Sequence, residues 1–370
     1  EPFYQVFNID SLVSTDYRTK IERYACKESF DFEYFNCRNV TETLFYYGRP
    51  LWGSLISASY VGILNLAIKK LILTSNITSL VQDHKCMLLS ILLFLSFSLK
   101  LIKFISFLDA FYPSLAVCAS RTTLLLSYNA EHDIELVAKY LATLYDLDVN
   151  SSCMRVKYLP EPVLAFASAY IMSDKNVACA IINKINGHLK MLDVNITGSL
   201  GELASQLILL LAFDKASNLN NKPVTVDSFL ETLVGRNNYS LISSQISEEM
   251  KEGILYFTHF IRKLDDLSIY DTVHDFLARG AAGHFNQNYK SIDLFIPVVL
   301  KNSSISYLFF QVKNHADYVS NDFVKNMHAD EMLFNRNSYK DNYINSVFVL
   351  MSLRLEQATK VQVFLAAHDS

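Results

Sequence analysis

The sequence contains few of the residues that interrupt compact structure, and it is low in charge. Its 370 residues include only 10 glycines, 7 prolines and one tryptophan, and 19% are charged. Disordered and low-complexity proteins are rich in proline, glycine and charged residues, so this composition excludes them. Because 51% of the residues are hydrophobic, the chain can bury a large core. Its length predicts two or three domains.

Strong basic charge and cysteine motifs are also absent. The formal net charge of −4 argues against a surface that is basic throughout, although a local basic channel for nucleic acid is compatible with it. The six cysteines show no C-x-x-C spacing, so they predict neither a zinc site nor a disulfide framework. Residues 1–5 do not resemble a signal peptide. We therefore expect an intracellular protein with reduced thiols, and the nucleus is one candidate location.

The apolar runs are too short to cross a bilayer. Residues 86–99 form a run of 14 residues without a charge, and Lys100 ends it, whereas a membrane-spanning helix needs about 20 apolar residues. We therefore expect a buried helix within a helical domain and no membrane insertion. A helical, membrane-associated scaffold organised by residues 54–120 is the alternative, because this part of the chain is the most apolar.

The first part of the chain predicts helices. Around residue 133, apolar residues recur at the three- and four-residue spacing of an amphipathic helix. They are Ile134, Val137, Leu141 and Leu144. Prolines at the start of residues 158–172 suit the entry of another helix. We expect an all-helical region over residues 1–155, followed by a second domain over residues 156–370.

The most informative stretch is residues 291–314. Two apolar runs rich in β-branched and aromatic residues flank the polar link 301–304, which predicts two antiparallel strands joined by a tight turn. Asp293 opens the first strand, while Gln311 and Lys313 lie two residues apart on the second and so share one face. Pairing of these strands places an acid, an amide and an ammonium group at one end of an apolar sheet.

These polar groups suit a divalent-metal site. Oxygens of Asp293 and Gln311 can hold Mg²⁺ or Mn²⁺, and Lys313 can steady the attacking water or the phosphate in phosphodiester cleavage. The structural alternative is that Asp293 caps a strand end and pairs with Lys313, while Gln311 is satisfied by hydrogen bonds. Pro297 cannot donate to a sheet ladder, so we expect a bend or an edge position just beyond Asp293.

Glu202 is the second acidic candidate. It lies in the first turn of a helix predicted over residues 198–213. Together with Ser199 it forms the pattern of a capping box, in which the carboxylate bonds a backbone N–H at the helix start. The alternative is that its carboxylate completes the metal site.

At these residues the sequence resembles the PD-(D/E)XK nuclease superfamily. Ile-Asp293-Leu is similar to the second motif of the superfamily, and Gln311-Val-Lys313 is similar to the third, with glutamine in place of the acid. The resemblance implies a Mg²⁺- or Mn²⁺-dependent nuclease in which Glu202, Asp293 and Gln311 bind the metal and Lys313 acts on the nucleophile and phosphate. Gln311 is neutral, so a catalytically inactive module that binds nucleic acid or a protein partner is the alternative.

The resemblance also implies an α/β (α+β) fold, a restriction-endonuclease-like mixed sheet flanked by helices. The sequence offers the implied order, which is a helix, three strands, a helix and a strand. A polar segment at about 216–276 predicts a helical insertion. The other elements are expected within 279–284, in the hairpin, over 321–334 (a helix), and at 344–353 and 360–366.

The expected substrate is nucleic acid, with DNA as the first candidate. The loop that precedes the hairpin contains polar and basic residues that can contact phosphate. These residues are His284, Asn286 and Lys290. As loop residues of these types are usually only solvated, the contact is a hypothesis that depends on the nuclease assignment.

A second, shorter resemblance concerns the segment Gly48-Arg-Pro-Leu-Trp52. It is similar to the helical region that follows a P-loop ATPase in Crinkler-like and related fungal proteins, where the nuclease lies downstream. No Walker A pattern occurs in the 370 residues, so we expect any NTPase module to lie upstream of them. A Gly- and Pro-rich turn anchored by Trp52 is the alternative.

Overall fold

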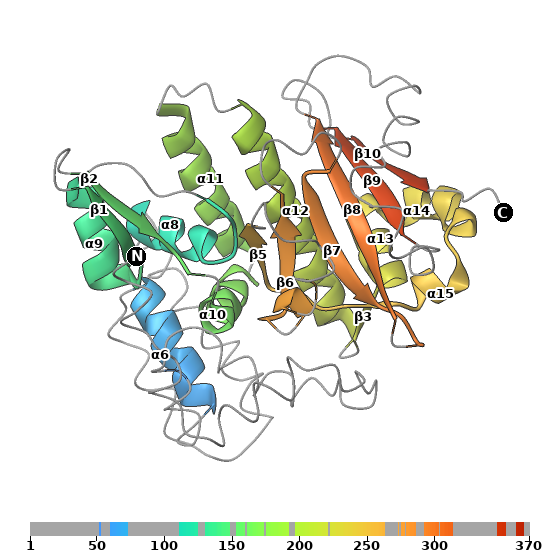
Figure 1. Ribbon diagram of the computed structural model, residues 1–370, viewed down its shortest axis with the longest axis horizontal. Helices are drawn as coiled ribbons and strands as arrows, with labels where there is room; N and C mark the ends of the chain where they lie inside the picture. Colours follow the sequence, from blue (N-terminus) through green and yellow to red (C-terminus); the bar gives the residue numbers. More distant parts are fainter. Residues whose placement is uncertain are drawn as a thin grey trace. The chain divides into compact units, whose positions relative to one another are not determined.

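The protein is a mixed α/β protein that folds into two compact units (Figure 1). The units divide between Asn195 and Ile196, and not near residue 155 as the sequence had suggested. We use a computed structural model. It describes residues 52, 60–72, 111–124, 130–148, 153–159, 161–173, 175–191, 197–220, 223–262, 273, 275–277, 279–285, 292–302, 304–313, 346–352 and 360–365.

The first unit combines helices with a short hairpin. Helix α10 packs against α6, and α11 packs against α8, which explains why residues 162–191 belong to this unit. The β1–β2 hairpin corrects the expectation of an all-helical region. The described elements are α6 (Tyr60–Ile72), α8 (Phe111–Ala119), α9 (Ala130–Tyr140), β1 (Thr143–Asp148), β2 (Cys153–Lys157), α10 (Pro162–Met172) and α11 (Lys175–Met191).

The helix predicted around residue 133 ends earlier than the apolar spacing, which continues to Leu144, had indicated. Helix α9 ends at Tyr140, because Leu141 adopts a left-handed backbone conformation with φ 63°. Leu136 and Tyr140 are buried, whereas Ile134 is 54% exposed, so the buried face is not the one that the spacing predicted. The residues beyond Leu141 form strand β1 instead.

Pro162 lies at the start of a helix, as the sequence predicted. Pro162 is the first residue of the helix, a position at which the missing N–H leaves no bond unmade. The preceding residue, Glu161, is fully buried and accepts a hydrogen bond from Trp52, with 2.7 Å between Nε1 and Oε2. The single tryptophan therefore does anchor this part of the first unit, although its neighbours 48–51 lie outside the described residues.

None of the helices that the structure describes is both long and apolar enough to cross a membrane. Residues 86–99, the apolar run that prompted the membrane alternative, lie outside the described ranges. The same holds for the helix expected over 321–334.

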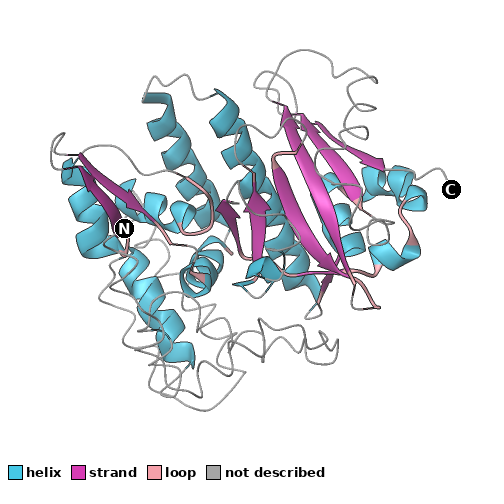
Figure 2. Cartoon of the chain, in the orientation of Figure 1, coloured by secondary structure: helices cyan, strands magenta, loops and turns pink. Residues whose placement is uncertain are grey.

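The second unit is a mixed sheet with helices. The sheet order is β10-β9-β8-β7-β4-β3, and β6 also pairs with β7 and carries β5 on its other side. Figure 2 shows the strands in magenta and the helices in cyan. The helices are α12 (Thr197–Asn220), α13 (Val226–Val234), α14 (Arg236–Ile242) and α15 (Glu248–Lys251), and a 3₁₀ turn covers Ser243–Gln245. The strands are β3 (Val224–Thr225), β4 (Ile254–Leu255), β5 (His259–Arg262), β6 (Ala281–His284), β7 (Leu294–Val299), β8 (Ile305–Lys313), β9 (Val347–Ser352) and β10 (Lys360–Leu365).

Strands β6 to β10 confirm the strands that the sequence predicted, including the β7–β8 hairpin. The insertion at about 216–276 is only partly helical. Its short helices are present, and α13 begins with a capping box between Thr225 and Ser228. However, this segment also contains the strands β4 and β5. Strand β4 pairs with β7 and β5 pairs with β6, so both extend the sheet.

Pro297 lies inside β7, which is a central strand. On one side β7 pairs with β8 throughout, and Pro297 stands opposite Tyr307. On the other side β6 pairs with residues 294–295 and β4 with residues 298–299. The ladder on that side therefore has a gap at the residue that has no N–H to donate. The predicted edge position is therefore wrong. Strand β7 is central, and at Pro297 its partner on this side changes from β6 to β4.

The sheet separates two apolar clusters. On one face α12 and α13 pack against β8, bringing together residues such as Phe213, Phe229 and Phe310 (Figure 1). On the other face lies an aromatic cluster that contains Phe295, where the rings of Tyr307 and Phe309 are stacked with centroids 5.3 Å apart. This alternation along β7 and β8 fixes the register of the hairpin, since a shift by one residue would exchange the two faces.

Candidate active site

Chemically active residues gather at one end of the sheet. Strands β5 and β6 are parallel, β7 is antiparallel to β6 and β8, and β8 and β9 are parallel. The last residues of β5, β6 and β8 therefore lie at the same end as the start of β7. These residues are Arg262, His284, Lys313 and, directly before β7, Asp293.

Glu202 reaches this end of the sheet from α12. The helix begins at Thr197, so Ser199 lies inside the helix and Glu202 lies beyond its first turn. Glu202 contacts His284, with 2.9 Å between Oε2 and Nε2. The two side chains are 16% and 3% exposed, so the pair is largely shielded from solvent.

His284 was predicted to contact phosphate from a loop. The small residues 281–283 continue β6 up to His284, which is therefore the last residue of a strand and not a loop residue. Its side chain is buried. Because the His284 side chain is buried and contacts Glu202, it is not accessible to a phosphate. Asn286 and Lys290, the other two residues of that prediction, lie outside the described residues.

Asp293 connects three strands at this end of the sheet. Its carboxylate oxygen Oδ2 accepts a hydrogen bond from the backbone N–H of Val312 at 2.6 Å. Its backbone N–H donates to the carbonyl of Phe310 at 2.9 Å, and its carbonyl accepts from the N–H of Phe285 at 2.8 Å. The carboxylate thus accepts a backbone N–H of β8 directly before β7 begins. Asp293 therefore caps the start of the strand, as the alternative to a metal site predicted.

The surroundings of Asp293 identify its charged neighbours. Burial, and to a smaller extent the nearby charge of Glu202, raise the pKa of its carboxyl group, which is about 6 when all neighbours are included. The Val312 N–H, Lys313 and His284 all lower it. The structure therefore brings Glu202, His284 and Lys313 close enough to Asp293 for their charges to act on it.

Gln311 and Lys313 share a face of β8, as their spacing predicted. They continue the series of Tyr307 and Phe309, on the face opposite α12, and Gln311 is only 2% exposed. Glu202 approaches from the α12 face. The polar groups thus lie on both faces at the same end of the sheet, where Asp293 precedes β7.

A family model described as a domain of unknown function (DUF8736) matches residues 110–357, more than half of the chain. The chain belongs to this family. The DUF8736 region extends from α8 to β9 and includes Glu202, Asp293 and β8. No curated protein and no solved structure matches the chain.

Glu202 and Asp293 are the two carboxylates that the sequence predicts as metal ligands in this DUF8736 protein. Mg²⁺ is commonly held by one or two carboxylates, with water and substrate phosphate completing its shell. Glu202 and Asp293 provide two carboxylates whose mutual repulsion contributes to the raised pKa of Asp293, and a divalent cation relieves such repulsion. Among the described residues no group of three or more His, Cys, Asp or Glu is placed to hold a metal.

The raised pKa of Asp293 predicts a pH-dependent stability for the DUF8736 fold. The carboxyl group ionises near pH 3.9 in the unfolded chain but near pH 6 in the folded protein. Stability from this group is complete below pH 4 and is lost as the pH rises through 6, by up to about 3 kcal/mol at 1.36 kcal/mol per pKa unit. Asp293→Asn keeps an oxygen for Val312 but cannot ionise. Urea unfolding should therefore show the variant to be more stable than wild type at pH 8 and similar at pH 4.

The matched control is Asp275→Asn, which removes the same charge from an exposed position. Wild type, variant and control are compared at each pH, so titration of all other groups cancels. An Asp293→Asn advantage that is the same at pH 4 and pH 8 would contradict the prediction.

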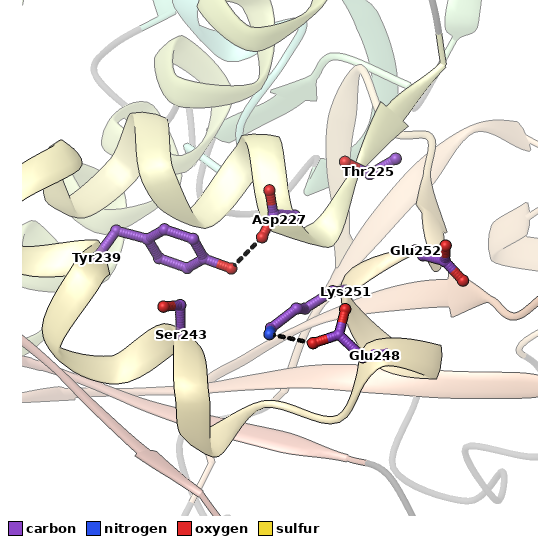
Figure 3. Close-up of a pocket in the computed structure, with 7 residues that line it drawn as sticks. All are labelled: Thr225, Asp227, Tyr239, Ser243, Glu248, Lys251 and Glu252. Carbon is purple, nitrogen blue, oxygen red and sulfur yellow. Dashed lines mark hydrogen bonds and ion pairs between the residues drawn. The ribbon is translucent and has the colours of Figure 1, made fainter.

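A separate pocket of about 410 Å³ lies in the insertion of the DUF8736 protein and contains none of the predicted site residues (Figure 3). Four of the polar side chains drawn there form two pairs. The Tyr239 hydroxyl donates to Asp227, and Lys251 forms an ion pair with Glu248. The lining residues are Thr225, Asp227, Tyr239, Ser243, Glu248, Lys251 and Glu252.

Proposed function

We propose that this protein is a metal-dependent nuclease that hydrolyses phosphodiester bonds, with DNA as its substrate. The observation that carries the proposal is the meeting of two carboxylates and a lysine at one end of a mixed sheet. Glu202 and Lys313 both act on the pKa of Asp293, and these are residues to which the resemblance to PD-(D/E)XK nucleases gives catalytic roles. The order of α12 and the strands β6, β7, β8 and β9 also agrees with that resemblance.

The two carboxylates have separate supports. The Val312 N–H holds the carboxylate of Asp293 in one orientation, and His284 does the same for Glu202. We assign both carboxylates to a Mg²⁺ or Mn²⁺ ion, with Gln311 as the neutral ligand that the resemblance implies. When bound, such an ion polarises the phosphate and lowers the pKa of coordinated water.

Lys313 supplies positive charge on the other side of Asp293. It is the last residue of β8 and partly exposed, and its charge lowers the pKa of Asp293. An ammonium group at this place stabilises the negative charge that develops on a phosphate during hydrolysis. The local cation also compensates for the net negative charge of the chain when a polyanion approaches.

The proposal is tested by plasmid nicking together with metal titration. We expect purified protein to convert supercoiled plasmid to the open circular form in Mg²⁺ or Mn²⁺ and not in EDTA. Calorimetric titration with Mg²⁺ at pH 6, in two buffers of different ionisation enthalpy, should show proton release, because Asp293 must lose its proton to bind the ion.

The two readouts separate the proposal from its alternative. The absence of both plasmid nicking and metal binding would overturn the hydrolytic assignment. Binding of DNA without any metal heat would instead favour a catalytically inactive module, the alternative that the neutral side chain of Gln311 supports.

A further inference from the structure

We propose that Arg262, the last residue of β5, binds a backbone phosphate of the nucleic acid beside the one that is cleaved. The inference rests on the proposed function, because it concerns the same end of the sheet. The sequence does not indicate this residue, since it predicts a helical insertion at about 216–276, whereas His259–Arg262 is a strand.

The register of β5 and β6 places Arg262 beside the Glu202–His284 pair. The two strands are parallel, and Arg262 stands opposite His284. Partner residues on neighbouring strands point to the same face and their backbones are about 4.8 Å apart. Since His284 contacts Glu202, the Arg262 side chain starts one strand spacing from the partner of a proposed metal ligand.

Among the described residues, none engages the side chain of Arg262. The residue is exposed, and its side chain forms no ion pair or hydrogen bond with another described residue. Three other cations of this unit are engaged. Arg236 pairs with Glu231, Lys251 with Glu248 and Lys301 with Glu252.

Arg262 and Lys313 lie on opposite sides of the acidic residues. From β5 to β8 there are three strand spacings, so the two backbones are about 14 Å apart at this end of the sheet. A nucleic-acid strand that crosses the ends of β5 to β8 passes Lys313, then the carboxylates, then Arg262. The planar fork of arginine matches a phosphate group in two parallel hydrogen bonds. A phosphate a few nucleotides from the scissile bond is therefore its ligand.

The test measures binding without cleavage. A fluorescein-labelled 20-base-pair DNA duplex is titrated with protein in EDTA and followed by anisotropy at several salt concentrations. Arg262→Gln should weaken binding about 3- to 10-fold at low salt and reduce the slope of log K against log salt by about 0.9, the contribution of one phosphate contact. Arg262→Lys should keep most of the slope. Arg236→Gln is the matched control, because it removes the same side chain from an exposed helix position.

Each result decides the inference. Equal affinity and equal salt slope for wild type and Arg262→Gln would overturn it and leave the proposed function intact, provided that wild type nicks plasmid. Failure of wild type to bind the duplex would also overturn it. Thermal unfolding of Arg262→Gln should match that of wild type, since the side chain is exposed, so weakened binding cannot be ascribed to loss of the fold.

Discussion

Asp293→Asn is expected to reduce Mg²⁺-dependent plasmid nicking by about 10²- to 10³-fold or more. The change removes the negative charge with which Asp293 is proposed to bind the metal ion. It keeps the shape of the side chain and an oxygen that accepts from the Val312 N–H. Lys313→Met is expected to have a similar effect, because it removes the ammonium group and keeps most of the stem. Initial rates of nicking for each variant relative to wild type give the measurement.

Asparagine is a sharper test than alanine at position 293. Alanine would leave the buried N–H of Val312 without its acceptor, at a cost of about 1–3 kcal/mol, so lost activity could reflect lost structure. Asp275→Asn is again the control for removal of an exposed carboxylate. Nicking at the wild-type rate by both Asp293→Asn and Lys313→Met would refute the assignment of the site.

Gly283→Ala is expected to destabilise the second unit by about 3 kcal/mol or more, the upper end of the range for overpacked cores. A Cβ at this position would lie 1.9 Å from Cε1 and 2.1 Å from Cζ of Phe295. The ring cannot retreat easily, because Phe295 is fully buried and packs against Phe276 and Phe285 with centroids 5.0 and 5.1 Å apart. Urea unfolding of the variant gives the measurement.

A double-mutant cycle tests the cause. Phe295→Leu removes the ring atoms that a methyl group at position 283 would meet, so the double variant should lose less stability than the sum of the single variants. Strictly additive costs would show that the ring is not the obstacle. Because Gly283 directly precedes His284, the single variant should also disturb the contact with Glu202.

The hairpin was predictable because its signals are local. Alternating apolar residues and the polar turn 301–304 define β7 and β8, and the spacing of Gln311 and Lys313 fixes their common face. Strands β4 and β5 were not predictable in this way. They contain only two and four residues, and what makes them strands is pairing with β7 and β6, which are distant in sequence.

The candidate site was predictable only where one element contains the signal. Asp293 is recognisable at the start of its strand, but the contact between Glu202 and His284 joins residues 82 positions apart. Nothing around His284 marks it as the partner of a helix residue. The sequence predicted that the helix starts near Gly198, whereas α12 starts at Thr197 and Glu202 lies beyond its first turn.

The change of neighbour at Pro297 divides β7 into two parts with different mechanical attachments. The half that adjoins Asp293 is held by β6 and β8, whereas the far half is held on one side by β4, which contributes only two residues. Local opening of β3 and β4 would therefore free only one edge of the far half, which β8 still pairs with on its other side. The half that adjoins Asp293 would keep both of its neighbours, β6 and β8.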